Sequence, residues 1–229
     1  MTLAFLLPWP LWQSLGLTLR LAAITTVVLA AGGLPLAHWL NTTRCRLAPA
    51  IETLVTLPVV LPPTVIGFYL LILFSPNRIP GRWWFSATGS TLAFSVTGLV
   101  IASVVYSLPF AVRPFQAALA AVPRELLDAG RTLGADTWRV WRRLHLPLAA
   151  RGVAAGLTLA FAHTLGEFGV VLMIGGSIPG VTRVASIALY DDVEALDYSQ
   201  AHSFAAVLLV LSFCLLLTVT LLQRRRIRA

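Results

Sequence analysis

The sequence predicts an all-α integral membrane protein that crosses a lipid bilayer about five times. Hydrophobic residues make up 58% of its 229 residues and charged residues only 11%, against roughly a quarter charged in ordinary globular proteins. A soluble domain of this length could not bury so much apolar surface, whereas a lipid-facing protein has no need to bury it. Because no linker or repeat divides the chain, residues 1–229 are predicted to form one transmembrane domain.

Five segments have the length and composition of membrane-spanning helices. Such a helix needs about 20 apolar residues to cross the hydrocarbon core. The first segment carries Arg20 near its outer end, from where a long side chain reaches the headgroups. The predicted spans are Leu15–Leu40, Leu47–Phe74, Thr91–Val112, Leu148–Ile174 and Ser203–Leu222.

The distribution of arginine predicts the orientation of these spans. Most arginines lie in the loop between spans one and two, in the segment between spans three and four, and in the C-terminal tail. The positive-inside rule therefore places the N-terminus outside and the C-terminus in the cytoplasm. The arginines predicted to be cytoplasmic are Arg44, Arg46, Arg113, Arg124, Arg131, Arg139, Arg142, Arg143, Arg151, Arg224, Arg225, Arg226 and Arg228. The external loops hold Arg78, Arg82 and Arg183, and the last of these loops also holds Asp191, Asp192, Glu194 and Asp197.

Several classes of function are disfavoured by composition. All 17 basic residues are arginine, and a P-loop needs a lysine to reach the phosphates of a nucleotide. The chain is therefore predicted not to be an ATPase or another enzyme, and any ATP must be bound by a separate subunit. The arginines form no basic surface interleaved with aromatic residues, so no nucleic-acid partner is expected. No cofactor or metal is predicted, because two candidate ligands, His163 and Glu167, are too few.

The longest cytoplasmic segment, residues 113–147, is predicted to contain two short helices that meet at a bend. Pro123 precedes a helix start, and Pro147 is expected to close the segment. Gly130 and Gly134 interrupt its middle. An amphipathic surface of this kind binds lipid headgroups or a partner protein. The apolar residues that recur at helical spacing are Leu126, Leu127, Leu133, Val140 and Leu144.

This segment resembles the EAA loop of ABC importer permeases. The family pattern is E-A-A, three residues, G, nine residues, then I-x-L-P. The matching residues here are Asp128, Ala129, Gly130, Gly134, Leu144 and Pro147. Asp128 replaces glutamate, Gly130 the second alanine and Leu144 isoleucine. The resemblance implies that these residues form coupling helices that dock on an ATPase subunit. We expect Gly134 to allow close backbone approach at the bend and Pro147 to fix the angle of span four.

Span two is predicted to be broken near the middle of the membrane. Pro58, Pro62 and Pro63 remove backbone hydrogen bonds there, and Thr64 and Gly67 follow. A broken helix is tolerated only where protein or a water-lined cavity satisfies the exposed groups. These residues are therefore candidates for a translocation path or gate, and a simple packing kink is the alternative.

Span four contributes the second set of path candidates, Gly166, Glu167, Phe168 and Gly169. Glu167 is placed well inside a span, where an ionisable group is costly and usually functional. His163 precedes it by one helical turn, so a hydrogen bond between the two is expected. A carboxylate repels an anion, which favours a gate or a helix-packing role for Glu167. A second motif, Gly152-x-x-x-Gly156, predicts close helix packing.

Along nearly its whole length the chain resembles the molybdate permease subunits of ABC importers. The stretches that carry the resemblance are Leu57–Gly67, Arg131–Ala135, Leu165–Gly169, Ile178–Arg183 and Ser186–Tyr190. It implies a type I permease fold in the bacterial cytoplasmic (inner) membrane. The implied partners are a second copy of the chain, two ATPase subunits and an external substrate-binding protein. The implied activity is ATP-driven import of molybdate or tungstate by alternating access. A permease for sulfate or another tetrahedral oxyanion is the alternative.

Two other classes of membrane protein fit the sequence less well. An intramembrane enzyme needs a convergent set of reactive groups near one interface, and only His163 and Glu167 pair up. An ion-coupled transporter or a channel usually shows inverted repeats and several intramembrane polar residues, which this sequence lacks. Co-purification with an ATPase would separate an ABC permease from both.

Overall fold

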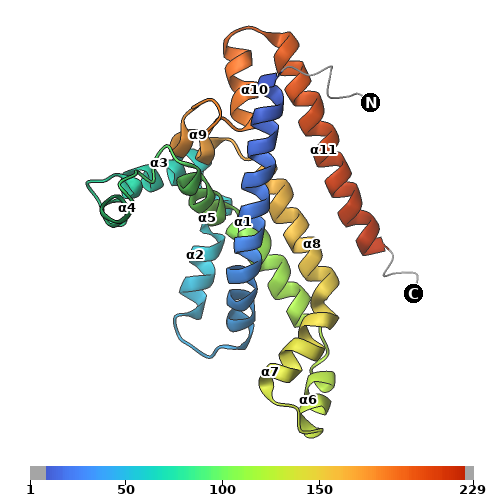
Figure 1. Ribbon diagram of the computed structural model, residues 1–229. Coiled ribbons are helices and arrows are strands. Elements are labelled where there is room, and N and C mark those ends of the chain that lie inside the picture. The colour runs from blue at the N-terminus through green and yellow to red at the C-terminus, as the bar shows by residue number, and fades with distance from the viewer. Residues whose placement is uncertain (1–8, 225–229) are drawn as a thin grey trace.

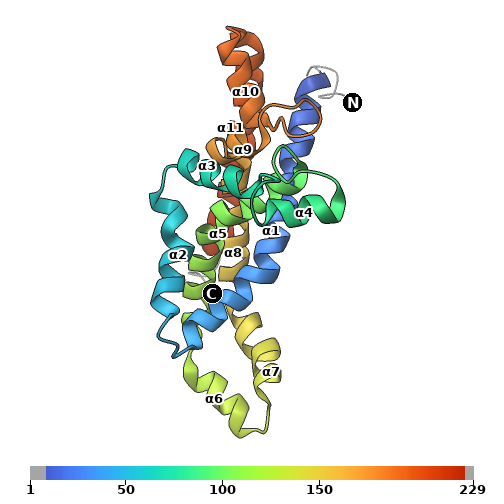
Figure 2. The ribbon, with the colours of Figure 1, turned by 90° about the vertical axis from the view of Figure 1, so that its left-hand side faces the viewer.

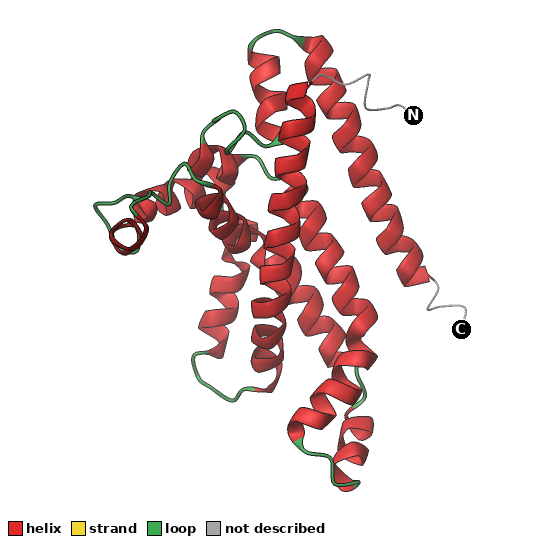
Figure 3. Ribbon diagram, in the orientation of Figure 1, coloured by secondary structure: helices red, strands yellow, loops and turns green. Residues whose placement is uncertain are grey.

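The computed structural model describes residues 9–224, and this part of the chain is helical without strands (Figure 3). Long helices pack side by side, and a shorter helical arm, formed by residues 124–145, projects from one end of the bundle (Figure 1 and Figure 2). The helices are α1 (Trp9–Thr42), α2 (Ala48–Val60), α3 (Pro63–Phe74), α4 (Gly81–Thr88), α5 (Val96–Ala120), α6 (Arg124–Thr132), α7 (Thr137–Val140), the π-helical turn η2 (Trp141–His145), α8 (Leu146–Leu165), α9 (Gly169–Gly175), α10 (Ala185–Glu194) and α11 (Tyr198–Arg224).

The prediction of about five spans is confirmed. Over residues 9–224, four helical stretches are long and apolar enough to cross a membrane, and a fifth span is possible if one bent pair counts as a span. The four are Leu11–Thr42, Val96–Ala120, Thr137–Leu165 and Tyr198–Thr218, and the bent pair consists of α2 and α3.

The predicted break in span two lies between α2 and α3, where the helix direction bends by 115°. Leu61 and Pro62 both adopt extended conformations, with ψ of 140° and 136°. Each of them precedes a proline, and a residue in that position is forced away from helical geometry. Pro63 then begins α3, because a missing N–H costs nothing at the first position of a helix. Two consecutive prolines therefore turn one apolar segment into two short helices.

The third span is longer than predicted, and this changes the placement of Arg113. The side chain of Ser95 accepts a hydrogen bond of 3.1 Å from the N–H of Gly98 and caps the start of α5. The helix continues through two internal prolines to Ala120. Phe115 and Leu119, beyond the second proline, are at most 2% exposed, and their burial offsets the lost backbone bonds. Arg113 thus lies inside a spanning helix and not in the loop.

The fourth span is shorter than predicted. The segment Leu148–Ile174 was expected to form one helix, but α8 ends at Leu165 and α9 is a separate short helix. Gly166, with φ −90° and ψ 1°, and Phe168, with φ −127° and ψ −62°, depart from helical geometry. Glu167 therefore sits in a break between two helices.

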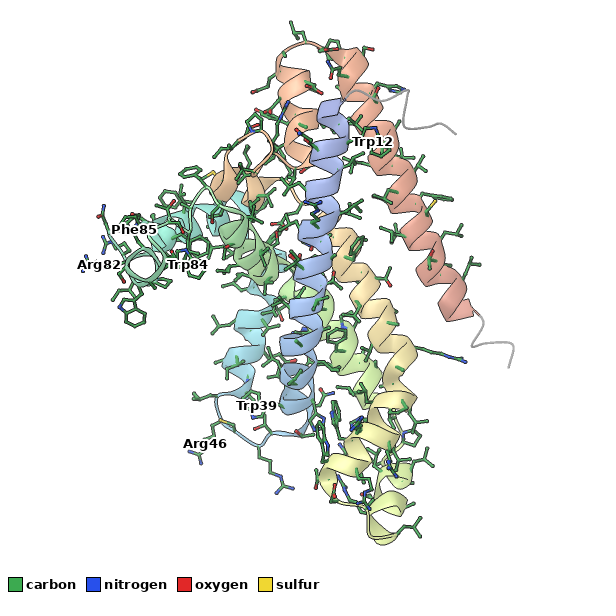
Figure 4. All side chains as sticks on the ribbon, in the orientation of Figure 1. Trp12, Trp39, Arg46, Arg82, Trp84 and Phe85 are labelled. Carbon is green, nitrogen blue, oxygen red and sulfur yellow. The ribbon has the colours of Figure 1, made fainter. Side chains whose placement is uncertain are left out.

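The first and fifth spans extend beyond their predicted ends, and two helices, α4 and α10, were not predicted. Trp12 and Trp39 lie toward opposite ends of α1 (Figure 4). Their separation along the helix is about 40 Å, which matches the distance between the two headgroup regions of a bilayer. Arg46 lies near the end of the bundle that carries α6 and α7, and Arg82 lies on α4, away from that end. The described residues stop at 224, so Arg225, Arg226 and Arg228 of the predicted cytoplasmic tail lie outside them.

Helix α5 lies at the centre of the bundle, in contact with α1, α2, α8 and α9. The predicted close packing at Gly152 and Gly156 is confirmed at its contact with α8. A Cβ atom on Gly152 would lie 2.5 Å from the Cβ of Ala118, and one on Gly156 would lie 2.9 Å from the Cβ of Pro114. Neither neighbour is the free end of a flexible side chain, so the two glycines set the distance between the helices.

Candidate functional site

The two sequence motifs predicted to line a path pack directly against each other. A Cβ on Gly67 of α3 would lie 2.7 Å from the Cβ of Met173 on α9. A Cβ on Gly169 would lie 3.0 Å from the Cβ and Cγ of Pro63. Both glycines therefore permit the close contact between α3 and α9. Two segments that are about one hundred positions apart in the sequence can thus come into close contact, because neither glycine has a side chain to separate them.

A cavity of about 570 Å³ opens where these motifs meet. Of the predicted path residues, Pro63, Thr64, Gly166, Glu167, Phe168 and Gly169 line it. The other lining residues are Tyr106, Ala162, His163, Leu172 and Met173. Three predicted path residues are absent from the lining. Pro58 is buried inside α2, Pro62 caps α3, and Gly67 lies at the contact between α3 and α9.

Glu167 is the buried acidic group of this cavity. Glu167 is only 4% exposed, and neither oxygen of its carboxylate has a hydrogen-bond partner within residues 9–224. Its backbone carbonyl accepts a hydrogen bond of 2.6 Å from the hydroxyl of Ser186 on α10. The neighbouring Phe168 ring packs against Tyr190 of the same helix at a centroid distance of 5.0 Å. Helix α10 therefore holds the break between α8 and α9 in place.

The expected hydrogen bond between His163 and Glu167 is wrong. The Nδ1 atom of His163 lies 3.0 Å from the hydroxyl of Ser107, which is 2.9 Å from the hydroxyl of Thr164. The imidazole stacks on Phe110 with centroids 3.7 Å apart. The helix ends at Leu165, so the one-turn spacing that would have joined the two side chains is lost. His163 instead connects α8 to α5.

The predicted helical arm is present, and it is continuous with span four. The carboxylate of Asp136 accepts a hydrogen bond of 2.7 Å from the N–H of Arg139 and caps a helix that runs from Thr137 to Leu165. Pro147 was expected to close the arm, and this is wrong. A π-helical turn ends at His145, two residues before Pro147, and its backbone hydrogen bonds join residues five apart. The helix therefore continues through Pro147, although the proline has no N–H to donate. Helix α7, the turn η2 and α8 therefore form one continuous helical element.

Gly130 and Gly134 differ from their expected roles. A Cβ on Gly130 would lie 2.6 Å from the Cδ1 of Leu144, so the close approach of the two arm helices occurs there. Within residues 9–224 no atom lies within 4 Å of a hypothetical Cβ on Gly134, and the φ of Gly134 is +81°. The expectation of a close approach at Gly134 is therefore wrong. Glycine is favoured there because other residues avoid a positive φ.

The base of the arm makes two contacts that the sequence did not indicate. The ring of Trp141 packs against His38 of α1 at a centroid distance of 4.1 Å, with the two ring planes tilted by 45°. The Nε2 of His145 donates a hydrogen bond of 3.0 Å to the carbonyl oxygen of Leu119 near the end of α5. The spacing of apolar residues carries no signal for either contact, because both join distant segments. The base of the arm thus contacts both α1 and α5.

The outer surface of the arm is apolar and exposed. Leu133 is 88% exposed, Trp138 67% and Leu126 48%. Asp128 forms an ion pair of 2.7 Å with Arg131 on α6, next to Ala129. Large apolar side chains exposed in a polar segment mark an interaction surface. The arm therefore presents a surface suited to another protein.

At the opposite end of the bundle, a charged cluster joins the loop before α10 to α10 itself. The Nε of Arg183 lies 2.8 Å from a carboxylate oxygen of Asp191, and its Nη2 lies 3.5 Å from one of Asp192. Ser177 donates a hydrogen bond of 2.6 Å to Asp191. Burial raises the pKa of Asp192 against the pull of Arg183, and the nearby carboxylates of Asp197 and Asp191 raise it further. This cluster fixes the loop before α10, the helix that supports Glu167.

A second cavity of about 540 Å³ lies between α2 and α5, nearer the arm. Arg113 forms an ion pair with Glu52 there, and its Nη2 and Nε donate hydrogen bonds of 2.7 and 3.1 Å to the hydroxyl of Thr56. The sequence missed this site because the third span was ended before Arg113. The periodicity of Tyr106, Phe110 and Arg113 was the available signal.

Residues 32–228 match the family described as binding-protein-dependent transport system inner membrane component. The chain belongs to this family. It is 47% identical over 93% of both chains to the molybdenum transport system permease protein ModB of Azotobacter vinelandii. It is 36% identical to ModB of Escherichia coli K12, over 90% of this chain and 89% of that protein. The sulfate transport system permease protein CysT of the same bacterium is 33% identical, over 91% of this chain and 75% of CysT.

Solved structures share the fold of this inner-membrane transport component at low sequence identity. A chain of the MetNI methionine ABC transporter superimposes with a TM-score of 0.75 at 18% identity, covering 98% of this chain and 99% of that one. A chain of a bacterial ABC transporter involved in alginate import gives a TM-score of 0.77 at 17% identity, covering 95% and 80%. The fold is therefore that of type I ABC importer permeases.

Proposed function

We propose that this chain is the permease subunit of an ATP-driven importer that moves molybdate, and with it tungstate, across the bacterial cytoplasmic membrane. The observation that carries the proposal is the 47% identity over 93% of both chains to a molybdenum transport permease. Molybdate and tungstate are tetrahedral dianions of nearly equal size, so one path serves both. The chain itself is not an enzyme, and a partner subunit binds and hydrolyses ATP.

The broken helices support a translocation path through the bundle. Two breaks, at Pro62–Pro63 and at Gly166–Phe168, meet at one cavity. Non-helical backbone inside a membrane needs protein or water to satisfy it, and paired helix breaks are typical of transport pathways. Glu167 acts here as a gate element, since its carboxylate would repel the dianion. The breaks provide the hinges on which the path opens alternately to each side.

The helical arm supports a role in coupling to the ATPase. Its exposed apolar face is suited to a groove on a partner, and its helix continues into α8. In our proposal two copies of this chain stand on two ATPase subunits, with the arm in the cytoplasm, the N-terminus outside and the C-terminus inside. Asp128, Ala129 and Gly134 lie on the arm with exposed surface. Gly130 and Leu144 hold its two helices together, and Pro147 lies just beyond the π-helical turn.

An external binding protein completes the proposed system. A solved alginate ABC transporter with a TM-score of 0.73 to this chain, at 18% identity, is described in complex with its pentasaccharide-bound periplasmic protein. By analogy, the end of the bundle that carries α10 would receive the loaded binding protein. The anion would then enter the path that the helix breaks line.

Uptake of labelled molybdate by cells that lack their own molybdate system tests the proposal. The chain is expressed with its cognate ATPase and binding protein, and unlabelled sulfate or tungstate is added as competitor. We expect saturable uptake that tungstate inhibits, that excess sulfate leaves intact and that a P-loop-dead ATPase abolishes. Inhibition by sulfate instead would move the substrate to sulfate, the anion of the related CysT. Absence of uptake with an intact complex would contradict an oxyanion substrate altogether.

A further inference from the structure

Arg113 and Glu52 form a charged pair on the surface of two spanning helices. Their side chains are 44% and 39% exposed. Arg113 lies seven residues before the end of α5 at Ala120, about 10 Å inside the helix. A charged side chain exposed on a membrane-spanning helix is unfavourable in lipid unless it reaches the headgroups. The face of α2 and α5 that carries this pair is therefore turned toward water or protein.

This face and the cavity that contains Glu167 lie on the same side of α5. Tyr106, Phe110 and Arg113 are spaced four and three residues apart and share one side of α5. Tyr106 lines the Glu167 cavity, and Phe110 stacks on His163, which lines it too. On the other wall, Val60 of α2 lines the Arg113 cavity, and Pro63 lines the Glu167 cavity. The two cavities share no lining residue, but α5 and the segment formed by α2 and α3 contribute to both.

The charges along this track differ in sign. The cavity nearer α10 contains the unpartnered carboxylate of Glu167. Of the described side chains that line the two cavities, Arg113 alone carries a permanent positive charge. A guanidinium binds tetrahedral oxyanions through two parallel N–H donors. The hydroxyls of Thr53 and Thr56 line the same cavity, but each donates its hydrogen to a backbone carbonyl of α2, so the guanidinium supplies the donors.

We propose that Arg113 binds the transported oxyanion at the arm end of the path, and that Glu52 is a displaceable counter-ion of this site. The inference rests on the proposed function, since it assumes that a tetrahedral dianion passes along this track. Arg113 is bound to Glu52 and Thr56 in the present conformation. An arriving dianion takes the place of the carboxylate on the guanidinium.

Competition from Glu52 explains how a site with an arginine can release a dianion. A conduit needs binding that is favourable enough to admit the ion and weak enough to let it leave. An unopposed guanidinium in a partly dry cavity would hold a dianion tightly. When Glu52 returns to Arg113, it replaces the contact that the leaving anion gives up. The pair therefore keeps the affinity of the site low.

The test compares Arg113→Gln, Arg113→Lys and Glu52→Gln in the complete complex, with its ATPase and binding protein, in liposomes. Arg151→Gln is the matched control, because Arg151 is another exposed arginine near the arm end of a spanning helix. We expect Arg113→Gln to lower the rate of labelled molybdate uptake about tenfold or more. Arg113→Lys should retain part of the rate, because a point charge replaces the fork. Arg151→Gln should transport at the wild-type rate.

Equilibrium binding of labelled molybdate to the detergent-solubilised complex gives a second readout that needs no turnover. Glu52→Gln should bind the anion severalfold more tightly than wild type and release it more slowly, while Arg113→Gln should bind it less. The double charge reversal, Arg113→Glu with Glu52→Arg, should not restore transport if the arginine must face the anion from α5. Restored transport in the reversed pair would mean that Arg113 and Glu52 form only a structural ion pair, and it would overturn the inference. Wild-type transport by Arg113→Gln would overturn it as well, whereas failure of the wild-type complex to move molybdate would instead contradict the proposed function.

Discussion

The Nε2 of His145 donates a hydrogen bond of 3.0 Å to the carbonyl oxygen of Leu119, and this bond ties the base of the helical arm to α5. Helix α5 also carries Tyr106 and Arg113, which line the two cavities. The arm therefore has two mechanical connections to the path. One is the continuous helix into α8, and the other is this bond to α5.

Loss of the His145 contact should weaken coupling more than folding. His145→Ala removes one hydrogen bond, worth about 1 kcal/mol, at the point where arm movement reaches α5. We expect the number of anions moved per ATP hydrolysed to fall severalfold while ATP hydrolysis by the complex continues. His145→Gln, whose amide can donate to the same carbonyl, should restore part of the ratio. An unchanged ratio in His145→Ala would mean that α8 alone carries the movement. His202→Ala, at an exposed position on α11, serves as the control.

The exposed face of the arm should determine binding of the ATPase. Leu133 is 88% exposed, and Leu133→Asp places a charge where an apolar contact is proposed. A central contact of an interface contributes about 2 kcal/mol or more, so co-purification of the ATPase should be largely lost at an unchanged melting temperature. Leu196 is 70% exposed at the opposite end of the molecule, and Leu196→Asp should leave co-purification intact. Equal retention of the ATPase by both variants would exclude Leu133 from the interface.

The bend of the arm should depend on backbone conformation at Gly134 and not on space. A residue with a Cβ at a φ of +81° costs about 1–2 kcal/mol, which corresponds to a factor of about 5–30 in the population of the correct bend. Gly134→Ala should therefore reduce transport within this range. Asparagine adopts positive φ more readily, so Gly134→Asn should retain more activity than Gly134→Ala. The opposite order in an uptake assay would show that side-chain volume decides, as the sequence motif alone suggests.

The contact between α5 and α8 should tolerate no added atoms at its two glycines. Gly152→Ala and Gly156→Ala each place a Cβ within 3 Å of a heavy atom on α5, and overpacking of this kind costs about 1–3 kcal/mol. Both variants should lower the melting temperature of the solubilised protein. Gly16→Ala on α1 meets nothing within 4 Å and should be neutral or stabilising, because alanine favours the helix. If all three variants changed the melting temperature equally, the close packing of α5 against α8 at Gly152 and Gly156 would be contradicted.

The charged cluster before α10 predicts a small pH effect. Burial raises the pKa of Asp192 above its ordinary value of 3.8, so the folded protein disfavours its ionised form. Relative to Asp192→Asn, the wild type should lose stability as the pH rises above 3.8 toward neutrality, because the raised pKa favours the protonated form in the folded state. Melting temperatures of both proteins, measured from about pH 4 to pH 7, check this. If the wild type instead became more stable relative to Asp192→Asn as the pH rises, the attraction of Arg183 for the carboxylate would be stronger than the effect of burial.

The helix breaks could be predicted where covalent structure dictates them. Consecutive prolines at 62 and 63 force an extended backbone in any surroundings, and the sequence located that break. The end of α8 at Leu165 depends on tertiary contacts of Glu167 and Phe168 with α10. Local sequence carries no information about such contacts, so span four was drawn too long. Arg113 was misplaced for the related reason that burial of Phe115 and Leu119 keeps α5 helical past its prolines.

The candidate site, too, could be predicted from local sequence only in part. The motifs around Pro63 and Glu167 were each recognised, and the cavity that they share was not, because it depends on the contacts of Gly67 with Met173 and of Gly169 with Pro63. Spacing within one helix can be derived from sequence, as for Gly152 and Gly156. Pairing between distant segments requires the fold.

The most direct test of the proposed import is ATP-dependent accumulation of labelled molybdate in liposomes. The purified chain is reconstituted with its ATPase, which is supplied with ATP, and the loaded binding protein is added on the opposite side. The account predicts accumulation of molybdate against its gradient when ATP is present, and none with a non-hydrolysable analogue. Equal movement with and without ATP, or no movement by a complex that still hydrolyses ATP, would contradict it.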